Sequence, residues 1–340
     1  MVQPTLKIST SPHLKQRITT DVIMRNVVWA LLPLAAFAVY SFGISTLLLL
    51  ATTTIAAVLT EHVLCRTSGQ KSTIFDWSAV ITGLLLGLTL PPIFPLWMAF
   101  MGGVISIGLG KFIFGGLGYN VFNPALVGRA ILQAAFPAAI TTWYPAFTPD
   151  RFTQVPASTL ALPFMQPPEV DVISGATPLA AFKFEGVRTE TTDLAMGLIS
   201  GSTGETCAVL ILLGGLYLVA RKMMNWRIPV AVLGSAFLLS GLFYLLNPAD
   251  YPHPVFMLFS GGLMLGAVYM ATDMVASPLT PLGVWIYGAF IGIVTIVIRL
   301  WGGLPEGVMY AILLANAVSP HIDGWIQPRV YGTNAKTATT

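Results

Sequence analysis

The chain has 340 residues, of which 55% are hydrophobic and only 9% are charged, and its formal net charge is +3. A soluble domain carries roughly 25% charged residues, so this composition, with a mean hydropathy of +0.77, excludes a soluble globular protein. It predicts an all-α integral membrane protein. Because the basic residues are scattered among the ends of apolar runs, a nucleic-acid surface is excluded. Cys65, Cys207 and four scattered histidines predict neither a metal site nor a disulfide framework.

In chain order, a cytoplasmic N-terminal segment (1–26) precedes about ten apolar runs, which we interpret as spans of roughly 30 Å of hydrocarbon although several of them are short. Five runs lie in 27–142 and five in 206–318, with a hydrophilic segment (143–205) between them and a tail (319–340) after them. The predicted spans are 27–43, 44–64, 77–92, 95–114, 124–142, 206–222, 228–246, 254–275, 282–298 and 304–318.

The basic residues predict the orientation, because Lys and Arg near span ends are retained on the cytoplasmic side. With both termini inside, Lys111 and most other bases fall at the inner face. The exceptions are Arg151, Lys183, Arg188 and Arg299. We therefore predict a multi-pass protein with cytoplasmic termini and an external loop at 143–205.

Two weak internal matches indicate that the chain contains one unit twice. Lys111-Phe-Ile-Phe-Gly-Gly resembles Arg299-Leu-Trp-Gly-Gly, and Thr82-Gly-Leu-Leu-Leu-Gly resembles Gly261-Gly-Leu-Met-Leu-Gly. Because each half holds five spans, an odd number, the second half enters the membrane upside down. The sequence thus predicts two inverted five-helix repeats.

Gly and Pro interrupt the predicted spans at 90–92, 115–124 and 270–278. Inverted repeats with broken helices place ligand or ion sites near the midplane, although Gly and Pro are also frequent in ordinary membrane helices. Polar groups at span ends are the candidates to line a cavity or an ion route. They are Asp76, Asn120, Asn123, Arg129, Glu205 and Asp273. Asp76 could equally cap the helix that follows it.

The external segment is acidic, and its proline-rich part, 145–168, predicts an irregular chain. A loop of this length is usually functional or disordered. It ends in a turn of small residues, Ser174-Gly-Ala-Thr-Pro. The simplest interpretation of this turn is helix initiation, with Thr177 as N-cap and Pro178 at the first helical position.

Several blocks occur in order over nearly the whole chain. They are Asp76-Trp-Ser-Ala, Gly115-Gly-Leu-Gly-Tyr-Asn, Phe122-Asn-Pro-Ala, Ser174-Gly-Ala-Thr-Pro-Leu-Ala, Gly201-Ser-Thr-Gly-Glu-Thr, Trp226-Arg-Ile-Pro, Ala271-Thr-Asp and Pro305-Glu-Gly-Val-Met-Tyr. Together they resemble the D-type membrane subunits of Rnf (Rsx) electron transport complexes, a family related to the B-type subunit of the sodium-pumping NADH:quinone oxidoreductase. Val172 and Ile173 depart from the small residue that commonly follows the motif's aspartate, which leaves the role of Asp171 open.

The resemblance implies that Thr177, with Ser174, Gly175 and Ala176 as its motif, carries covalent FMN as a threonine phosphoester. A flavin transferase would install this group from FAD. A non-covalent riboflavin is implied nearer the inner side, where Asn120, Asn123, Arg129, Asp76 and Asp273 would line its cavity or an ion route. No residue is assigned a catalytic role.

The implied function is that of a subunit, not active alone, of an ion-translocating ferredoxin:NAD oxidoreductase in the bacterial inner membrane. It would relay electrons between flavin and iron–sulfur partners, coupled to Na⁺ or H⁺ transport, with the motif loop in the periplasm. The implied partners are subunits of the A, B, C, E and G types and membrane lipid. The alternatives are a small-solute channel or transporter, and the B-type subunit of the sodium-pumping oxidoreductase, which usually has a longer N-terminal segment.

Overall fold

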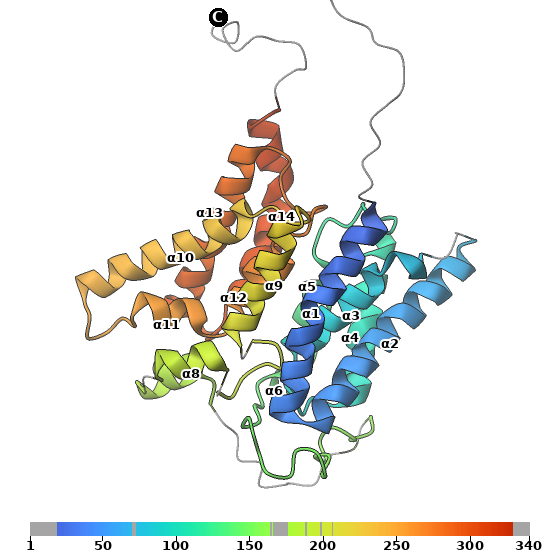
Figure 1. The fold of residues 1–340 in the computed structure, drawn as a ribbon, viewed down its shortest axis with the longest axis horizontal. Coiled ribbons are helices and arrows are strands. Elements are labelled where there is room, and N and C mark those ends of the chain that lie inside the picture. The colour runs from blue at the N-terminus through green and yellow to red at the C-terminus, as the bar shows by residue number, and fades with distance from the viewer. Residues whose placement is uncertain are drawn as a thin grey trace, which may run out of the picture.

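The computed structural model describes residues 19–69, 73–163, 165, 176–187, 189–197, 199–205 and 207–328. All regular structure in these residues is helical, which confirms the all-α prediction. Figure 1 shows two groups of helices side by side, α1 to α5 in one and α9 to α14 in the other. The short helices α6 and α8 lie at the end of the molecule opposite the start of α1.

The first group opens with two long helices joined at Gly43, whose φ of 82° suits a residue without a side chain. A Cβ there would lie 1.9 Å from the carbonyl oxygen of Arg151. The elements of this group are α1 (Thr20–Phe42), α2 (Ile44–Thr67), η1 (Ile74–Asp76), α3 (Ser78–Thr89), α4 (Leu96–Gly108), η2 (Phe112–Phe114), α5 (Pro124–Ala135) and α6 (Pro137–Ile140). Prolines at 91, 92, 124 and 137 stand at the breaks, because proline lacks the N–H that a continuing helix needs.

The connecting segment and the second group contain shorter pieces and two π-helical turns. Their elements are α7 (Pro178–Ala180), η3 (Ala181–Glu185), α8 (Thr191–Met196), α9 (Ala208–Ala220), α10 (Arg227–Leu246), α11 (Pro254–Phe259), α12 (Leu263–Leu265), η4 (Gly266–Met270), α13 (Pro281–Trp301) and α14 (Val308–Trp325). The connecting segment 143–205, predicted to be irregular at 145–168, carries helices in its later part.

Five helices within the described residues are long and apolar enough to cross a membrane. They are Thr20–Phe42, Ile44–Thr67, Leu96–Phe114, Arg227–Leu246 and Pro281–Trp301. The chain is thus a multi-pass membrane protein, and five of the predicted spans are confirmed at full length.

The other predicted spans contain shorter or interrupted helices. α3 and α5 have 12 residues each, or about 18 Å at about 1.5 Å per residue, well short of roughly 30 Å of hydrocarbon. The predicted span 254–275 is divided among α11, α12 and η4. The helix of the last predicted span, α14, continues beyond residue 318 through Pro320 to Trp325.

Contacts near helix ends show two pairs of helices that pack in parallel. Trp226, just before α10, and Trp285, in the first turns of α13, have ring centroids 6.1 Å apart. Phe243, near the end of α10, and Trp301, at the end of α13, have ring centroids 5.0 Å apart. In the first group, Gly103 of α4 packs on Ala56 of α2, and the ends of the same helices meet through Lys111 and Glu61. α2 and α4 therefore run in one direction together, as do α10 and α13.

Glycines allow the helices of each pair to approach closely, as is common between membrane helices. On α13, a Cβ at Gly292 would lie 2.4 Å from the carbonyl oxygen of Val232 and 2.1 Å from Oγ of Ser235, both on α10. Gly234, on α10 itself, faces open space, with no neighbouring atom within 4 Å of a Cβ.

Gly292→Ala should therefore destabilise the protein, while Gly234→Ala should not. The first forces α10 and α13 apart and should cost about 1–3 kcal/mol. The second only reduces the freedom of the unfolded chain and should be neutral or stabilising by up to about 1 kcal/mol. Denaturant unfolding in detergent micelles measures both, and equal stability of the two variants would contradict the packing described.

Candidate functional site

Thr177 stands at the start of α7, with Pro178 at the first helical position. Its side-chain oxygen accepts a hydrogen bond from the backbone N–H of Ala180 at 3.3 Å, which confirms the predicted N-cap. Thr177 is half-buried, between the exposed Ala176 and the buried Pro178. Ser174 and Gly175 lie outside the described residues. The threonine hydroxyl is thus held at the surface end of a helix whose next residues are buried.

Two apolar contacts fasten this helix to the second group. The side chain of Leu179 lies against Gly261, where a Cβ would be 2.8 Å from Leu179 Cδ1. The ring of Phe182 packs on that of Phe256 in α11, with centroids 5.7 Å apart. The position of Thr177 is therefore set by α11 and by the break that follows it.

Lys183 fastens the same segment to the end of α13. Its Nζ donates to the carbonyl oxygens of Arg299 at 2.9 Å, Gly302 at 2.5 Å and Leu304 at 3.2 Å. A cation is favourable here, because the last carbonyls of a helix lack partners and form the negative end of its dipole. Partial burial lowers the pKa of Lys183.

A cavity of about 280 Å³ lies between the two groups, where α1, α3 and α5 begin. Its wall is mainly aliphatic, with methionines 24, 223, 224 and 274. The polar side chains that line it include Thr20, Ser78, Thr82, Lys111, Asn120, Asn123, Tyr269, Thr272 and Asp273. The cavity therefore combines a large apolar surface with a few hydrogen-bonding groups, as small-molecule sites do.

Three of the predicted residues meet at this cavity. Nδ2 of Asn120 donates to Oδ2 of Asp273 at 3.0 Å, and Nδ2 of Asn123 donates to the carbonyl oxygen of Met270 at 3.2 Å. Asn123 also caps α5 through the N–H groups of Ala125 and Leu126. These bonds join the break before α5 to the break after η4, so the two groups meet where their helices are interrupted.

Asp76 is not among the residues that line the cavity. Its Oδ1 accepts from the N–H of Ser78 at 2.9 Å and from Ser78 Oγ at 2.5 Å, so it caps α3. Ser78, in contrast, lines the cavity. The capping interpretation of Asp76 is the one that the contacts support.

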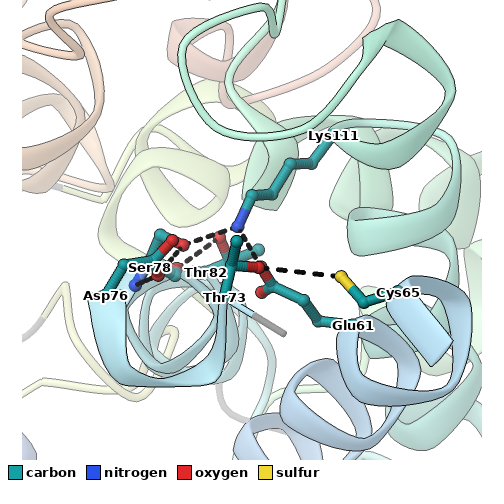
Figure 2. A network of polar contacts seen from close by, with 7 residues as sticks. All are labelled: Glu61, Cys65, Thr73, Asp76, Ser78, Thr82 and Lys111. Atoms are coloured by element: carbon teal, nitrogen blue, oxygen red, sulfur yellow. Dashed lines mark hydrogen bonds and ion pairs between the residues drawn. The ribbon is translucent and has the colours of Figure 1, made fainter. Parts of the chain in front are cut away.

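Asp76 belongs to a larger polar network that was not predicted (Figure 2). Lys111 Nζ reaches between Glu61 Oε1, at 2.6 Å, and Ser78 Oγ, at 2.5 Å. Thr73 donates a further hydrogen bond to Glu61. Lys111 is only 4% exposed, so this basic side chain is buried and not hydrated at a surface. Its charge is paired inside the protein.

Arg129 also lies away from the cavity, in a second buried cluster. Its guanidinium donates to Glu205 Oε1 at 3.2 Å and to Glu306 Oε2 at 3.1 Å. Glu306 accepts a further bond from the N–H of Gly262. The sequence marked Arg129 and Glu205 as polar residues at span ends, but no pattern indicated that Glu306 joins them.

These features define a class of protein: a multi-pass membrane protein with a ligand-sized cavity between two groups of helices. The chain matches the model of the NQR2, RnfD, RnfE family over residues 7–332. This match shows that the chain belongs to the NQR2, RnfD, RnfE family.

Relatives of known description cover almost the whole chain. It is 41% identical to the D-type subunit of the proton-translocating ferredoxin:NAD(+) oxidoreductase complex of Clostridium ljungdahlii, over 96% of both chains. It is 41% identical to the D-type subunit of the Na(+)-translocating ferredoxin:NAD(+) oxidoreductase complex of Acetobacterium woodii, over 96% of this chain and 95% of the relative. Identity to the D-type subunit of the ion-translocating oxidoreductase complex of Alcanivorax borkumensis is 36%, over 98% of both.

Removing the Lys183 anchor should loosen the segment that carries Thr177. Lys183→Met deletes three hydrogen bonds to carbonyls while retaining the length of the side chain. The free energy of local opening should therefore fall, and a protease should cut within 178–187 several-fold faster. Phe184→Ala, which alters a side chain that is 69% exposed, is the matched control and should leave the cutting rate unchanged. Equal rates in wild type and Lys183→Met would show that Lys183 does not hold the segment.

Proposed function

We propose that this chain is the D-type membrane subunit of an ion-translocating ferredoxin:NAD oxidoreductase complex, and that Thr177 carries its covalent FMN. Identity of 41% over nearly full length to relatives named as the D-type subunits of such complexes carries the first part of the proposal. The half-buried hydroxyl of Thr177, fastened on the second helix group, supports the second part.

The residues around Thr177 are compatible with a phosphoester. A threonine hydroxyl is a weak nucleophile at its free pKa, so the flavin transferase would have to remove its proton as the Oγ1–phosphorus bond forms, the pyrophosphate bond of FAD breaks and AMP leaves. In the described residues the hydroxyl oxygen has only the capping contact with Ala180, which a transferase can displace locally. FMN supplies one- and two-electron transfer when bound, and the protein positions it. Leu179, Phe182 and Lys183 would hold that position.

The cavity between the two groups is proposed to hold a non-covalent riboflavin. Its aliphatic and methionine wall suits a flat ring system, and the amides of Asn120 and Asn123 with the carboxylate of Asp273 offer donors and acceptors for polar ring edges or the sugar chain. Arg129 and Asp76, predicted for the same cavity or an ion route, are assigned no contact with this ligand.

We further propose that the two groups are inverted repeats in the bacterial inner membrane. The pair α2 and α4 ends at the cavity side, near Lys111, whereas the pair α10 and α13 begins on that side, just after Met224. Opposite directions of matching pairs are what an inverted repeat requires. The basic residues favour a cytoplasmic cavity side with both termini, and a periplasmic Thr177.

The proposed partners are the other subunits of the complex, of the A, B, C, E and G types, together with the flavin transferase during maturation. Electrons would pass between their flavin and iron–sulfur groups and the flavins held here, coupled to Na⁺ or H⁺ transport. The channel alternative has no support among the relatives described above, whose names all denote oxidoreductase subunits. Those names likewise denote D-type subunits rather than the B-type subunit of the sodium-pumping enzyme.

Thr177→Val should abolish the covalent flavin, because it removes the hydroxyl while keeping the size and branching of the side chain. Thr177→Ser should retain a flavin, and Thr191→Val, at the start of α8, should leave labelling at the wild-type level. The measurement is flavin fluorescence of the band in a denaturing gel after co-expression with the transferase. Fluorescence that persists in Thr177→Val would reject Thr177 as the site.

Val27→Trp should displace the non-covalent flavin alone. Val27 lines the cavity, and an indole ring there would occupy space that the ligand needs. Leu32→Trp, on the same helix at a position that is 42% exposed, is the control. After denaturation of the purified complex, released riboflavin should fall several-fold in Val27→Trp, while gel fluorescence at Thr177 stays constant. An unchanged amount of released riboflavin would show that this ligand binds elsewhere.

A further inference from the structure

Two carboxylates share one guanidinium where the two helix groups meet. Arg129 of α5 donates to Glu205, in the segment before α9, at 3.2 Å, and to Glu306, in the turn before α14, at 3.1 Å. Arg129 and Glu205 are each only 7% exposed. The side chain of Glu306 is more accessible, with 19% exposed. A single cation does not fully offset two carboxylates at such a site, since both have lost much of their hydration.

A second guanidinium lies nearby, but it is engaged elsewhere. Arg299 donates to the carbonyl oxygens of Met257 at 2.6 Å and Ser260 at 2.9 Å. It therefore contributes a charge to the surroundings of Glu205 and no hydrogen bond to either carboxylate. With both bases counted, the cluster is neutral when both acids are ionised and singly positive when one acid is protonated.

Gly262 brings the two carboxylates together. Its N–H donates to Glu306, and a Cβ on this residue would lie 2.6 Å from Glu205 Oε1 and 2.8 Å from Glu306 Oε1. Both oxygens thus lie against the same side-chain-free position. Carboxylates that share a buried site repel each other, and protonation of one relieves the repulsion.

We propose that Glu205 and Glu306 form a proton-exchange site, in which Glu205 reversibly binds one proton. Protonation converts the carboxylate of Glu205 to a carboxylic acid by forming one O–H bond, with no electron transferred. Burial, followed by the charge of Glu306, raises the pKa of Glu205 to about 7, against the opposing effect of Arg129. The charged groups that face Glu205 in the described residues are Arg129, Glu306 and, at longer range, Arg299.

The site lies directly beneath the segment that begins at Thr177. Leu179, two residues further on, packs on Gly261, and a Cβ at Gly261 would also lie 2.7 Å from Glu306 Oε1. On the basis of the proposed function, an electron delivered by a partner protein to a cofactor on Thr177 would add negative charge near this site and would increase the affinity of Glu205 for a proton. Electron arrival and proton uptake would then be coupled by electrostatics across one layer of side chains.

The proton site is tested without the covalent flavin, in the Thr177→Val chain, by infrared difference spectra between about pH 8 and about pH 6. The carbonyl stretch of a protonated carboxylic acid should appear as the pH falls through about 7. It should be absent in Glu205→Gln and present in the control Glu61→Gln, which removes a buried carboxylate from the other network. An unchanged band in Glu205→Gln, or no band in the parent, would overturn the proposal.

If Glu205→Gln fails to fold, Glu306→Gln decides the question. Removing the charge of Glu306 should shift the same band to lower pH, and a band that does not shift would contradict a shared site. The coupling is tested separately, on chains whose covalent flavin is verified, by the pH dependence of the flavin midpoint potential. A change of slope near pH 7 should be present in the wild type and absent in Glu205→Gln. Lack of flavin would reject the proposed function but leave the proton site standing.

Discussion

Polar groups inside this chain must be satisfied by one another, because apolar surroundings offer no water to hydrate a charge or an open helix end. That constraint explains where the two helix groups touch. Asn123 fills the open end of α5 and also donates to the carbonyl oxygen of Met270, where η4 stops. Arg129 draws Glu205 and Glu306 to α5. The two helix groups are joined at their broken helices, because the breaks contain the polar atoms that need hydrogen-bond partners.

The same constraint creates the sites. A continuous helix exposes no backbone polar groups along its length, whereas the interruptions between η2 and α5 and between η4 and α13 leave side chains such as Asn120 and Asp273 facing a cavity. On the opposite side, the end of α13 offers carbonyls to Lys183, and this bond positions the segment of Thr177. The cavity and the position of Thr177 are thus two results of helices that stop inside the protein.

Much of this arrangement follows from local sequence signals. Hydropathy locates the long helices, Pro178 after Thr177 and Pro124 after Asn123 mark helix starts, and both caps are present in the structure. Residues 120, 123 and 273 could be chosen as polar residues at breaks. The sequence could not show that these three residues line one cavity, because their contact depends on how two distant segments pack.

The features that the sequence did not reveal have a common cause. Glu61 lies inside an apolar run, and its partner Lys111 is 50 positions away, so neither hydropathy nor spacing reveals the pair. The rule for cytoplasmic bases concerns the side of the membrane on which a base lies, and it gives no sign that Lys111 pairs inside the protein. Helix length was overestimated for α3, α5 and 254–275, because runs of apolar residues continue through turns and into further short helices such as α6 and α12.

The most direct test of this account is the mass spectrum of the peptide that contains Thr177, from the chain purified out of its native membrane with its partners. We predict the mass of the peptide plus one FMN joined through a phosphoester, with fragment ions that assign the addition to Thr177. An unmodified peptide, or an addition on another residue, would contradict the assignment of Thr177 as the residue to which the flavin is attached.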